Sequence, residues 1–380
     1  MNRRVVITGM GALSALGSTP EELWNGLLAG RSGIRRLQRF VDAGLLVTTG
    51  GEIMAISHER TDRDVMMANW AIGDALAGQD LNLQATAFVW STGLDTFQGG
   101  PNGFEHRDAG ACFASLAARF GGPKMMIATA CASGTQAIGE GARLIKSGRV
   151  DACMTGGSSV MLTPFYLMGF SGLQAVAQDN GWDDPSEACR PFDRRRCGFA
   201  LADGAGALLL ESLDCARRRR ASILAEVVGF GMSQDGFDFN RPPEDGAGAE
   251  ICIKRALQDA RLSPSDIHAI NAHGTGTYIG DLAEATALRR VFGVKTPVSG
   301  AKGAIGHAMA AAGALEAVIA VKTCMTGIVP PTVNLSEVDE ACELDHVLKE
   351  PRDAHVEHVM SVSFGMGGQN AAIILKRLSE

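Results

Sequence analysis

One cysteine stands apart from the others because of what surrounds it. Cys131 lies in the stretch MMIATACASGTQAIGEGARLIKSG, where an apolar run ends and a helical pattern begins, and its neighbours are alanine, serine and glycine. The unpaired N–H groups and the dipole at the start of a helix stabilise a thiolate and lower the pKa of a cysteine there. The pattern therefore predicts a reactive thiol with a lowered pKa, with room for an acyl group to approach the sulfur.

The other eight cysteines have no comparable surroundings. They are scattered, the total of nine is odd, and no CxxC pair occurs. Reduced, structural thiols are more common than disulfides in such a chain, which favours a cytoplasmic location.

A second candidate site is the stretch NAHGTGTYIGDLAEATALRRVFG. His273 ends an apolar run and enters a glycine-threonine turn. Asp281 is expected to cap the next helix, with Glu284 three residues on in the spacing of a capping box. Two threonine hydroxyls belong to the same turn: Thr275 and Thr277.

Two further stretches carry groups that could act on a carbonyl. In SGAKGAIGHAMAAAG, Lys302 follows an expected strand and His307 begins a long alanine-rich helix. The helix dipole disfavours a cationic histidine there, so His307 is expected to stay neutral and able to donate a hydrogen bond. SVSFGMGGQN is a strand that runs into a glycine-rich turn, which supplies backbone N–H groups. No GxxxxGK[ST] string is present, so a phosphate loop is disfavoured.

Strands and helices alternate along the chain, which predicts an α/β fold with helix-covered sheets. Buried strands are expected at residues 4–9, 124–130, 151–159, 206–212, 223–231, 268–273, 297–301, 358–365 and 370–378. Helices are expected from Pro20, after Cys131, and over residues 249–262, the last with Ile251, Ile253, Ala256 and Leu257 on one face.

Charge and hydropathy exclude two classes of partner. The net charge of -7 argues against nucleic-acid binding, which needs a basic surface. Residues 306–325 are long enough to span a membrane, but His307, Glu316 and Lys322 interrupt them. A buried core helix and no membrane span are therefore expected. The basic, apolar start of the chain lacks a clear cleavage region and is read as a strand, not a signal peptide.

Five motifs then follow one another in a fixed order: ATACASG, PFDRRRCGFALADGAG, NAHGTGT, AKGAIGH and SFGMGGQN. In these motifs the chain resembles, over essentially its whole length, the elongating β-ketoacyl-acyl-carrier-protein synthases. The resemblance implies a thiolase-like, five-layered αβαβα fold made of two similar halves. Residues 1–220 would form the N-terminal half with the nucleophilic cysteine, and residues 221–380 the C-terminal half with both catalytic histidines.

The same resemblance implies an activity. Cys131 would take an acyl chain from the phosphopantetheine thioester of acyl carrier protein, and malonyl carrier protein would lose carbon dioxide and condense with it. His273 and His307 match the catalytic histidines, and Lys302 the family lysine with Glu284 as its acidic partner. Asp281 matches a supporting position, and the N–H groups of Phe364 and Cys131 would form an oxyanion hole. Thr275 and Thr277 would bind the pantetheine arm, and Phe199 and Met366 would contact the substrate. No bound cofactor or metal is implied.

Partners also follow from the resemblance. The family is dimeric, and the strand that leads to the cysteine helps form the interface, so a homodimer or a heterodimer with a related ketosynthase-like subunit is expected. Acyl carrier proteins are acidic, so docking needs a local basic patch. The candidate arginines are Arg60, Arg63, Arg194 to Arg196 and Arg217 to Arg220, although Arg196 lies within a motif and could be structural.

Several departures from the family pattern leave the substrate open. Residues 47–64 and 92–122 look short, Tyr278 stands where proline is common, and Met366 stands where many members carry a gating phenylalanine. Fatty-acid and polyketide or polyene pathways both remain open. Two alternatives remain as well: a non-catalytic or chain-length-determining partner subunit of a condensing heterodimer, and a thiolase-fold acyltransferase acting on coenzyme A esters.

Overall fold

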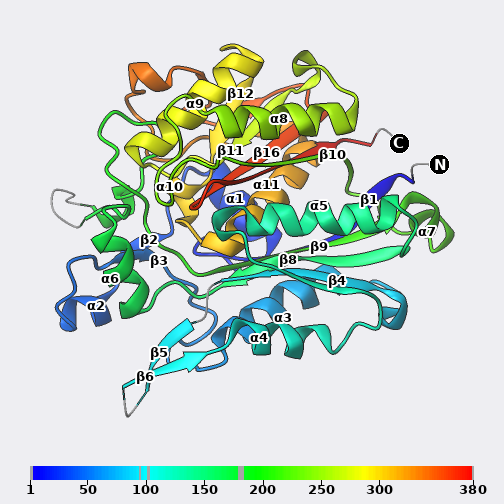
Figure 1. Ribbon diagram of the computed structural model, residues 1–380, viewed down its shortest axis with the longest axis horizontal. Helices are drawn as coiled ribbons and strands as arrows, with labels where there is room; N and C mark the ends of the chain where they lie inside the picture. Colours follow the sequence, from blue (N-terminus) through cyan, green and yellow to red (C-terminus); the bar gives the residue numbers. More distant parts are fainter. Residues whose placement is uncertain (1–2, 94–95, 101–102, 179–183, 379–380) are drawn as a thin grey trace.

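Strands β1 (Val5–Leu13) and β10 (Ala225–Gln234) lie side by side and join two halves of the chain (Figure 1). Their antiparallel pairing is short, from Val5–Ile7 to Ala225–Val227. The computed structural model describes residues 3–93, 96–100, 103–178 and 184–378. Through this junction, strands of both halves form one hydrogen-bonded sheet that runs through two layers of the molecule.

The two halves repeat one pattern of strand pairing. From β1 outward the strands are β9 (Gly204–Ser212), β8 (Ala152–Ser159), β4 (Ala87–Thr92) and β7 (Lys124–Ile127). From β10 outward they are β17 (Gln369–Lys376), β16 (His358–Gly365), β11 (Ala269–Ala272), β12 (Pro297–Gly300) and β14 (Asp345–His346). In both series the first two pairings are antiparallel and the next two parallel. The predicted construction from two similar halves is confirmed.

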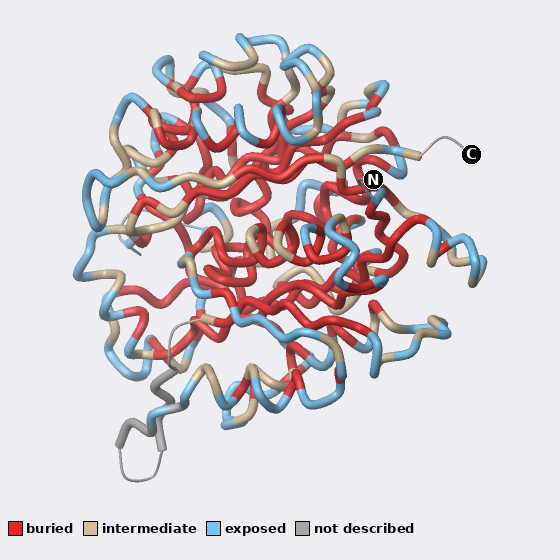
Figure 2. Tube along the Cα trace, turned by 45° about the vertical axis from the view of Figure 1, so that its right-hand side comes forward, coloured by how far each residue is buried: buried red, intermediate tan, exposed pale blue. Residues whose placement is uncertain are grey.

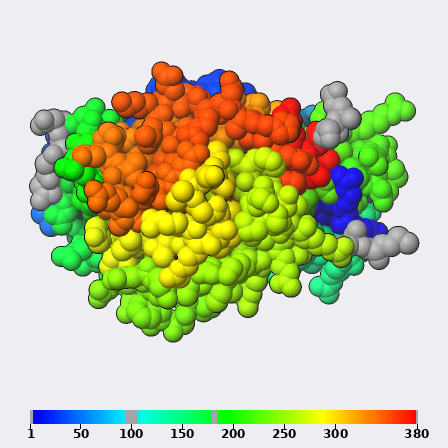
Figure 3. All heavy atoms as spheres, turned by 90° about the horizontal axis from the view of Figure 1, so that it is seen from above, coloured from blue at the N-terminus to red at the C-terminus, as the bar shows by residue number. Residues whose placement is uncertain are grey.

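Helices fill three layers around these strands, which completes the predicted αβαβα order (Figures 1 and 2). The central layer holds α5 (Ser133–Lys146) and α11 (Ala312–Thr326), each packed against strands of both halves. On the β1 side the outer layer holds α3 (Arg63–Leu76) and α4 (Ala109–Ala117). On the β10 side, α8 (Ala247–Ala260) and α9 (Tyr278–Phe292) lie side by side, and Figure 3 looks onto that face.

Shorter elements surround the layers. The helices are α1 (Pro20–Leu28), α2 (Gln38–Asp42), α6 (Pro164–Gly172), α7 (Leu213–Arg218) and α10 (Lys302–Ile305). The short strands are paired as β2 (Ile34–Arg36) with β3 (Thr49–Gly51), β5 (Thr96–Gly100) with β6 (Gly103–Arg107), and β13 (Ile328–Val329) with β15 (Arg352–Asp353). The β5–β6 hairpin, inside the segment predicted to be short, extends away from the layers (Figure 1).

The expected strands are all present, but some of their ends differ. β9 starts at Gly204 and β10 ends at Gln234, both beyond the predicted ranges, whereas β7 already ends at Ile127, and the largest difference is in β1. β1 continues through Gly11 to Leu13 rather than ending at Gly9. A Cβ at Gly9 or Gly11 would lie 2.0 Å from a carbonyl oxygen of α3. These glycines therefore allow a helix to pack directly on the strand and do not mark a turn.

Two helix predictions are corrected. In α8, Cys252, Ile253, Ala256 and Leu257 are buried, whereas Ile251 is 46% exposed, so Ile251 does not belong to the core face. The alanine-rich helix α11 begins at Ala312 and not at His307, because α10 and a short 3₁₀ turn (Met309–Ala311) come first.

The apolar stretch Met309–Thr326 is a core element. It is the one helical segment of the described chain that is long and apolar enough to cross a membrane, and 89% of it is buried inside the protein. α11 packs against α5 so closely that a Cβ at Gly134 would lie 2.6 Å from the backbone nitrogen of Ala314. The small residues after Cys131 thus serve the approach of two helices, a reason that the sequence alone did not reveal.

Candidate active site

Cys131 lies in a strained turn between β7 and α5. It occupies the middle of a 3₁₀ turn (Ala130–Ala132), and the preceding Ala130 has a φ of 50°, in the left-handed region. Ser133 closes this turn, since its Oγ accepts from the Thr129 N–H at 2.7 Å and donates to the Ala130 carbonyl at 2.6 Å. The turn delivers the thiol to the inside of the protein, where Cys131 is 4% exposed.

Two histidines from the C-terminal half meet this thiol. His307 Nε2 lies 3.1 Å from Cys131 Sγ, and the His307 and His273 rings are 5.4 Å apart at an interplanar angle of 84°. One donor atom of each of the three residues lies within 4.8 Å of the others, and all three residues are buried. Such a set resembles the donors of zinc sites, so the expectation that no metal is bound stays a prediction.

A buried lysine fixes the tautomer of His273. Lys302 Nζ lies 3.2 Å from His273 Nδ1, and it also donates to the His273 carbonyl and to Glu316 Oε1. Because an ammonium group only donates hydrogen bonds, Nδ1 must accept and Nε2 must carry the proton. His273 therefore presents an N–H donor to the site.

The acidic partner of Lys302 is Glu316, not Glu284 as predicted. The side chains of Lys302 and Glu316 are completely buried and form an ion pair. Glu284 instead accepts the backbone N–H groups of His273 and Gly274, each at 2.7 Å. Burial raises the pKa of Glu284 to about 8, so this carboxyl group is mostly neutral at pH 7. It holds the turn that carries His273.

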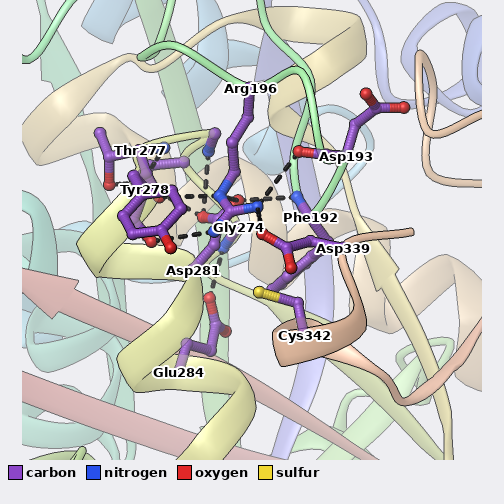
Figure 4. A network of polar contacts seen from close by, with 12 residues as sticks. Phe192, Asp193, Arg196, Gly274, Thr277, Tyr278, Asp281, Glu284, Asp339 and Cys342 are labelled. Carbon is purple, nitrogen blue, oxygen red and sulfur yellow. Dashed lines mark hydrogen bonds and ion pairs between the residues drawn. The ribbon is translucent and has the colours of Figure 1, made fainter. Parts of the chain in front are cut away.

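Asp281 also holds this turn and does not cap the helix after it (Figure 4). α9 begins at Tyr278, three residues before Asp281, with Thr277 at the N-cap position. Asp281 accepts from the backbone N–H of Phe192 at 2.7 Å and of Gly276 at 3.0 Å. The helix starts earlier than the capping-box spacing suggested, because the Asp281 and Glu284 side chains both accept hydrogen bonds from backbone N–H groups outside α9.

Arg196 is the structural arginine of the PFDRRRCGF motif. Its guanidinium donates to the Thr277 and Tyr278 carbonyls at 3.4 and 3.1 Å and to Asp339 at 2.6 Å. It also lies 4.8 Å from the centre of the Tyr278 ring (Figure 4). Arg196 is buried, so it ties the motif to the start of α9 and offers no surface charge.

The expected direction of the Cys131 pKa is wrong. Burial raises the pKa of the thiol to about 11 and outweighs the backbone N–H of Met366 and the charge of Lys302, which favour the thiolate. Burial, and secondarily Lys302, lowers the pKa of both His273 and His307 well below the usual value. The resting site therefore holds a neutral thiol between two neutral imidazoles.

The glycine-rich turn brings a backbone N–H to the thiol. The N–H of Met366, in the glycine-rich turn, favours the thiolate form of Cys131. The part of the Phe364 N–H in the oxyanion hole stays a prediction. Phe364 places its ring 5.9 Å from the ring of His273, at 74°. An oxyanion near Sγ would therefore meet the N–H groups of Cys131 and Met366.

A cavity of about 470 Å³ leads from the surface to this thiol. Its lining contains most of the predicted residues: Cys131, Phe199, His273, Thr275, Thr277, Glu284, His307, Phe364 and Met366. The Thr275 and Thr277 hydroxyls face each other at 2.9 Å, and the Phe199 ring stands edge-on to His307 at 5.1 Å. Lys302 and Asp281 do not line the cavity. They position residues that do line it.

Sequence reasoning missed two residues of the site. Glu316 could have been found, because a single acidic residue inside an apolar helix needs a buried partner, and Lys302 was available. Met309 carried no such signal. Its Sδ lies 3.6 Å from Cys131 Sγ, and its φ of 44° is in the left-handed region.

Two family models match most of the chain. The N-terminal domain of β-ketoacyl synthase matches residues 2–64 and 77–216, and the C-terminal domain matches residues 224–336. The chain belongs to the β-ketoacyl synthase family. A member of this family from Coxiella burnetii, a 3-oxoacyl-[acyl-carrier-protein] synthase 2, is 35% identical over 411 residues, covering 99% of both chains.

Solved ketosynthases have the same fold. A structure of a type II polyketide acyl-carrier protein in complex with its ketosynthase, bound to the hexaketide, superimposes with a TM-score of 0.91 at 27% identity over 100% of both chains. The ishigamide ketosynthase/chain length factor superimposes with a TM-score of 0.89 at 31% identity, again over 100% of both chains.

Proposed function

We propose that this chain catalyses the decarboxylative Claisen condensation of a Cys131-bound acyl chain with malonyl-acyl carrier protein, giving 3-ketoacyl-acyl carrier protein. The observation that carries the proposal is the meeting of Cys131, His273 and His307 at the base of an open cavity. The names of the relatives, which include 3-oxoacyl-[acyl-carrier-protein] synthases, support the same reaction.

In the first step, the acyl chain is transferred to the enzyme. Cys131 passes its proton to His307 Nε2, 3.1 Å away, as its sulfur attacks the thioester carbonyl. The new S–C bond forms, the bond to the pantetheine sulfur breaks, and that sulfur leaves as a thiol with the proton from His307. The N–H groups of Cys131 and Met366 stabilise the negative oxygen of the tetrahedral intermediate.

In the second step, the malonyl thioester loses its carboxylate. The bond between C2 and the carboxylate breaks and releases carbon dioxide, while the thioester oxygen gains negative charge as an enolate. The N–H of His273 Nε2 and the imidazole of His307 stabilise that oxygen. The C2 carbon then bonds to the Cys131-bound carbonyl and the S–C bond breaks. The departing thiolate takes up one proton from solvent, which restores the thiol. Neutral imidazoles suit this role, since they donate hydrogen bonds without fully protonating the enolate.

The phosphopantetheine arm of acyl carrier protein is the proposed carrier of both substrates, with no bound cofactor. Thr275 and Thr277 line the cavity between the surface and Cys131 and offer hydroxyls to such an arm. A coenzyme A acyltransferase is less well supported, because the last glycine-rich turn holds methionine and no second cysteine. A non-catalytic partner subunit is disfavoured because thiol and histidines are all in place.

A second subunit is proposed at the edge strand β7. This strand ends its half of the sheet, and Met125 and Met126 on it are 37% and 42% exposed. Unpaired backbone groups and apolar side chains on one edge favour pairing with another chain. The solved relatives that contain a chain length factor support a related partner subunit, and a homodimer is the alternative assembly. A cytoplasmic location is consistent with the buried position of α11.

The test is a reconstituted reaction with acyl and malonyl carrier proteins. The expected products are an acylated Cys131 peptide, carbon dioxide and a 3-ketoacyl carrier protein. Cys131→Ala should form neither the acyl-enzyme nor the product. A parent protein that carries acyl groups on Cys131 but forms no 3-ketoacyl product with malonyl carrier protein would favour a plain acyltransferase instead.

A further inference from the structure

Most arginines that were predicted to dock an acidic carrier are already paired within the chain. Charges that are neutralised in this way contribute little to a long-range attraction. The pairs are Arg60 with Asp62, Arg63 with Asp203, Arg194 with Glu337, Arg195 with Asp193, Arg196 with Asp339, Arg218 with Asp151, and Arg219 with Glu211. Arg63 and Arg196 are also buried, so neither can meet a partner.

A different arginine lies where the substrate must enter. Arg241 is exposed and lines the cavity that ends at Cys131. Among the described residues that line this cavity, it has the only side chain with a permanent positive charge. In the described part of the chain, its guanidinium has no hydrogen bond or ion pair, although Asp238 is close enough to feel its charge. Arg241 is therefore available to a ligand.

The backbone around Arg241 is held in place. Asp238 Oδ1 accepts the N–H groups of Asn240 and Arg241 at 2.8 and 3.0 Å. The Phe239 carbonyl accepts the Gly367 N–H at 2.8 Å, from the same glycine-rich turn that carries Met366. The segment with Arg241 is thus connected to the turn opposite the catalytic thiol.

We infer that Arg241 binds the phosphate of the phosphopantetheine arm, an inference that rests on the proposed function. The thioester must reach Cys131, which is buried at the base of the cavity, so the opposite end of the arm lies near the rim. That end carries the one charged group of the arm, its phosphate. A guanidinium group can donate two parallel hydrogen bonds to phosphate oxygens, which makes arginine well suited to this contact. Coenzyme A carries the same phosphorylated pantetheine.

The experiment compares two small substrates that differ only in the phosphate: an acyl-pantetheine and the corresponding acyl-4′-phosphopantetheine. The rate constant for acylation of Cys131 is measured with each by intact-protein mass spectrometry. The parent enzyme should prefer the phosphorylated arm by roughly tenfold, the value of one charge-assisted hydrogen bond. Arg241→Ala should bring the ratio close to one, and Arg241→Lys should restore part of it. Arg31→Ala, at an exposed arginine outside the cavity lining, is the matched control and should keep the parent ratio.

Three results would overturn the inference: no preference in the parent, a preference that survives in Arg241→Ala, or an equal loss in Arg31→Ala. A further arm uses acyl carrier protein and acyl-coenzyme A. A lower acylation rate of Arg241→Ala with both of these substrates supports recognition of the shared arm. A lower rate with the carrier protein alone would show that Arg241 contacts the protein instead. If no thioester acylates Cys131 at all, the proposed function itself fails. Equal acylation by both small substrates would remove only the role of Arg241.

Discussion

His307 Nε2 lies 3.1 Å from Cys131 Sγ, whereas His273 accepts a hydrogen bond from Lys302 at its Nδ1, the ring nitrogen that does not face the site. The two imidazoles are both buried and neutral, yet they face different partners. His307 Nδ1 has no hydrogen-bond partner in the described structure, so its tautomer is free to change as it exchanges a proton with the thiol. His273 is fixed as an N–H donor. Removal of His307 and removal of His273 should therefore slow different steps of the reaction.

We expect His307→Ala to slow both acyl loading and malonyl decarboxylation, and His273→Ala to slow mainly decarboxylation. The loss of a positioned donor or base is typically about 10² to 10⁴-fold in rate. Loading is followed by mass spectrometry and decarboxylation by release of labelled carbon dioxide. Decarboxylation at the parent rate in both variants would show that neither imidazole stabilises the enolate.

The Lys302–Glu316 pair should be essential for stability as well as for the tautomer of His273. Glu316→Leu leaves the buried charge of Lys302 unpaired and should lower the free energy of unfolding by about 3 to 5 kcal/mol. Lys302→Met leaves the Glu316 carboxyl group, whose pKa burial already raises to about 7, neutral but without its partner, and should cost about 1 to 3 kcal/mol. Removing both leaves no uncompensated charge. The double variant should be less destabilised than the sum of the single variants in thermal or denaturant unfolding. Strict additivity would show that the pair does not act as a unit.

The raised pKa of Cys131 predicts a pH profile. With the thiol pKa at about 11, the thiolate fraction is small at neutral pH and grows as the pH rises. Alkylation of Cys131 by iodoacetamide should therefore increase by nearly tenfold per pH unit between about pH 7 and 9, without a plateau. Peptide mapping separates this signal from that of the exposed Cys197. A plateau near neutral pH would instead indicate the lowered pKa that the position before α5 had suggested.

Met366 should influence which acyl chains are accepted. Its side chain lines the cavity, and its N–H acts on the thiol. Methionine is flexible and fills irregular space, so it should reject an ill-fitting chain less sharply than a phenylalanine ring would. Met366→Phe is expected to change the ranking of saturated and polyunsaturated acyl carrier substrates while malonyl decarboxylation stays nearly unchanged. An identical ranking in parent and variant would leave Met366 as a packing residue.

Local patterns were sufficient to predict most strands of the large sheet, although β4 was missed, and the position of Cys131. β8, β9, β16 and β17 are short apolar runs between turns, and Cys131 lies between a strand and a helix as expected. The division into residues 1–220 and 221–380 remains a prediction, because β1 and β10 join strands of both parts in one sheet.

Pairings between distant residues were harder to predict. Glu284 and Glu316 both lie on helices at plausible distances in sequence from Lys302, and only the fold shows that Glu316 reaches it. The pKa of Cys131 was mispredicted for a related reason: the helix start was visible in the sequence, but the depth of burial was not. The start of α9 was missed because Asp281 and Glu284 hydrogen-bond to the backbone of a turn and of the distant Phe192.

The central claim is that Cys131 carries the acyl chain that condenses with a malonyl unit. The most direct measurement incubates the protein with an acyl carrier protein, isolates the acyl-enzyme, and then adds malonyl carrier protein. The account predicts an acyl mass on the Cys131 peptide that disappears as carbon dioxide and a 3-ketoacyl carrier protein form in equal amounts. A stable acyl group on another residue, or product formed by Cys131→Ala at the parent rate, would contradict it.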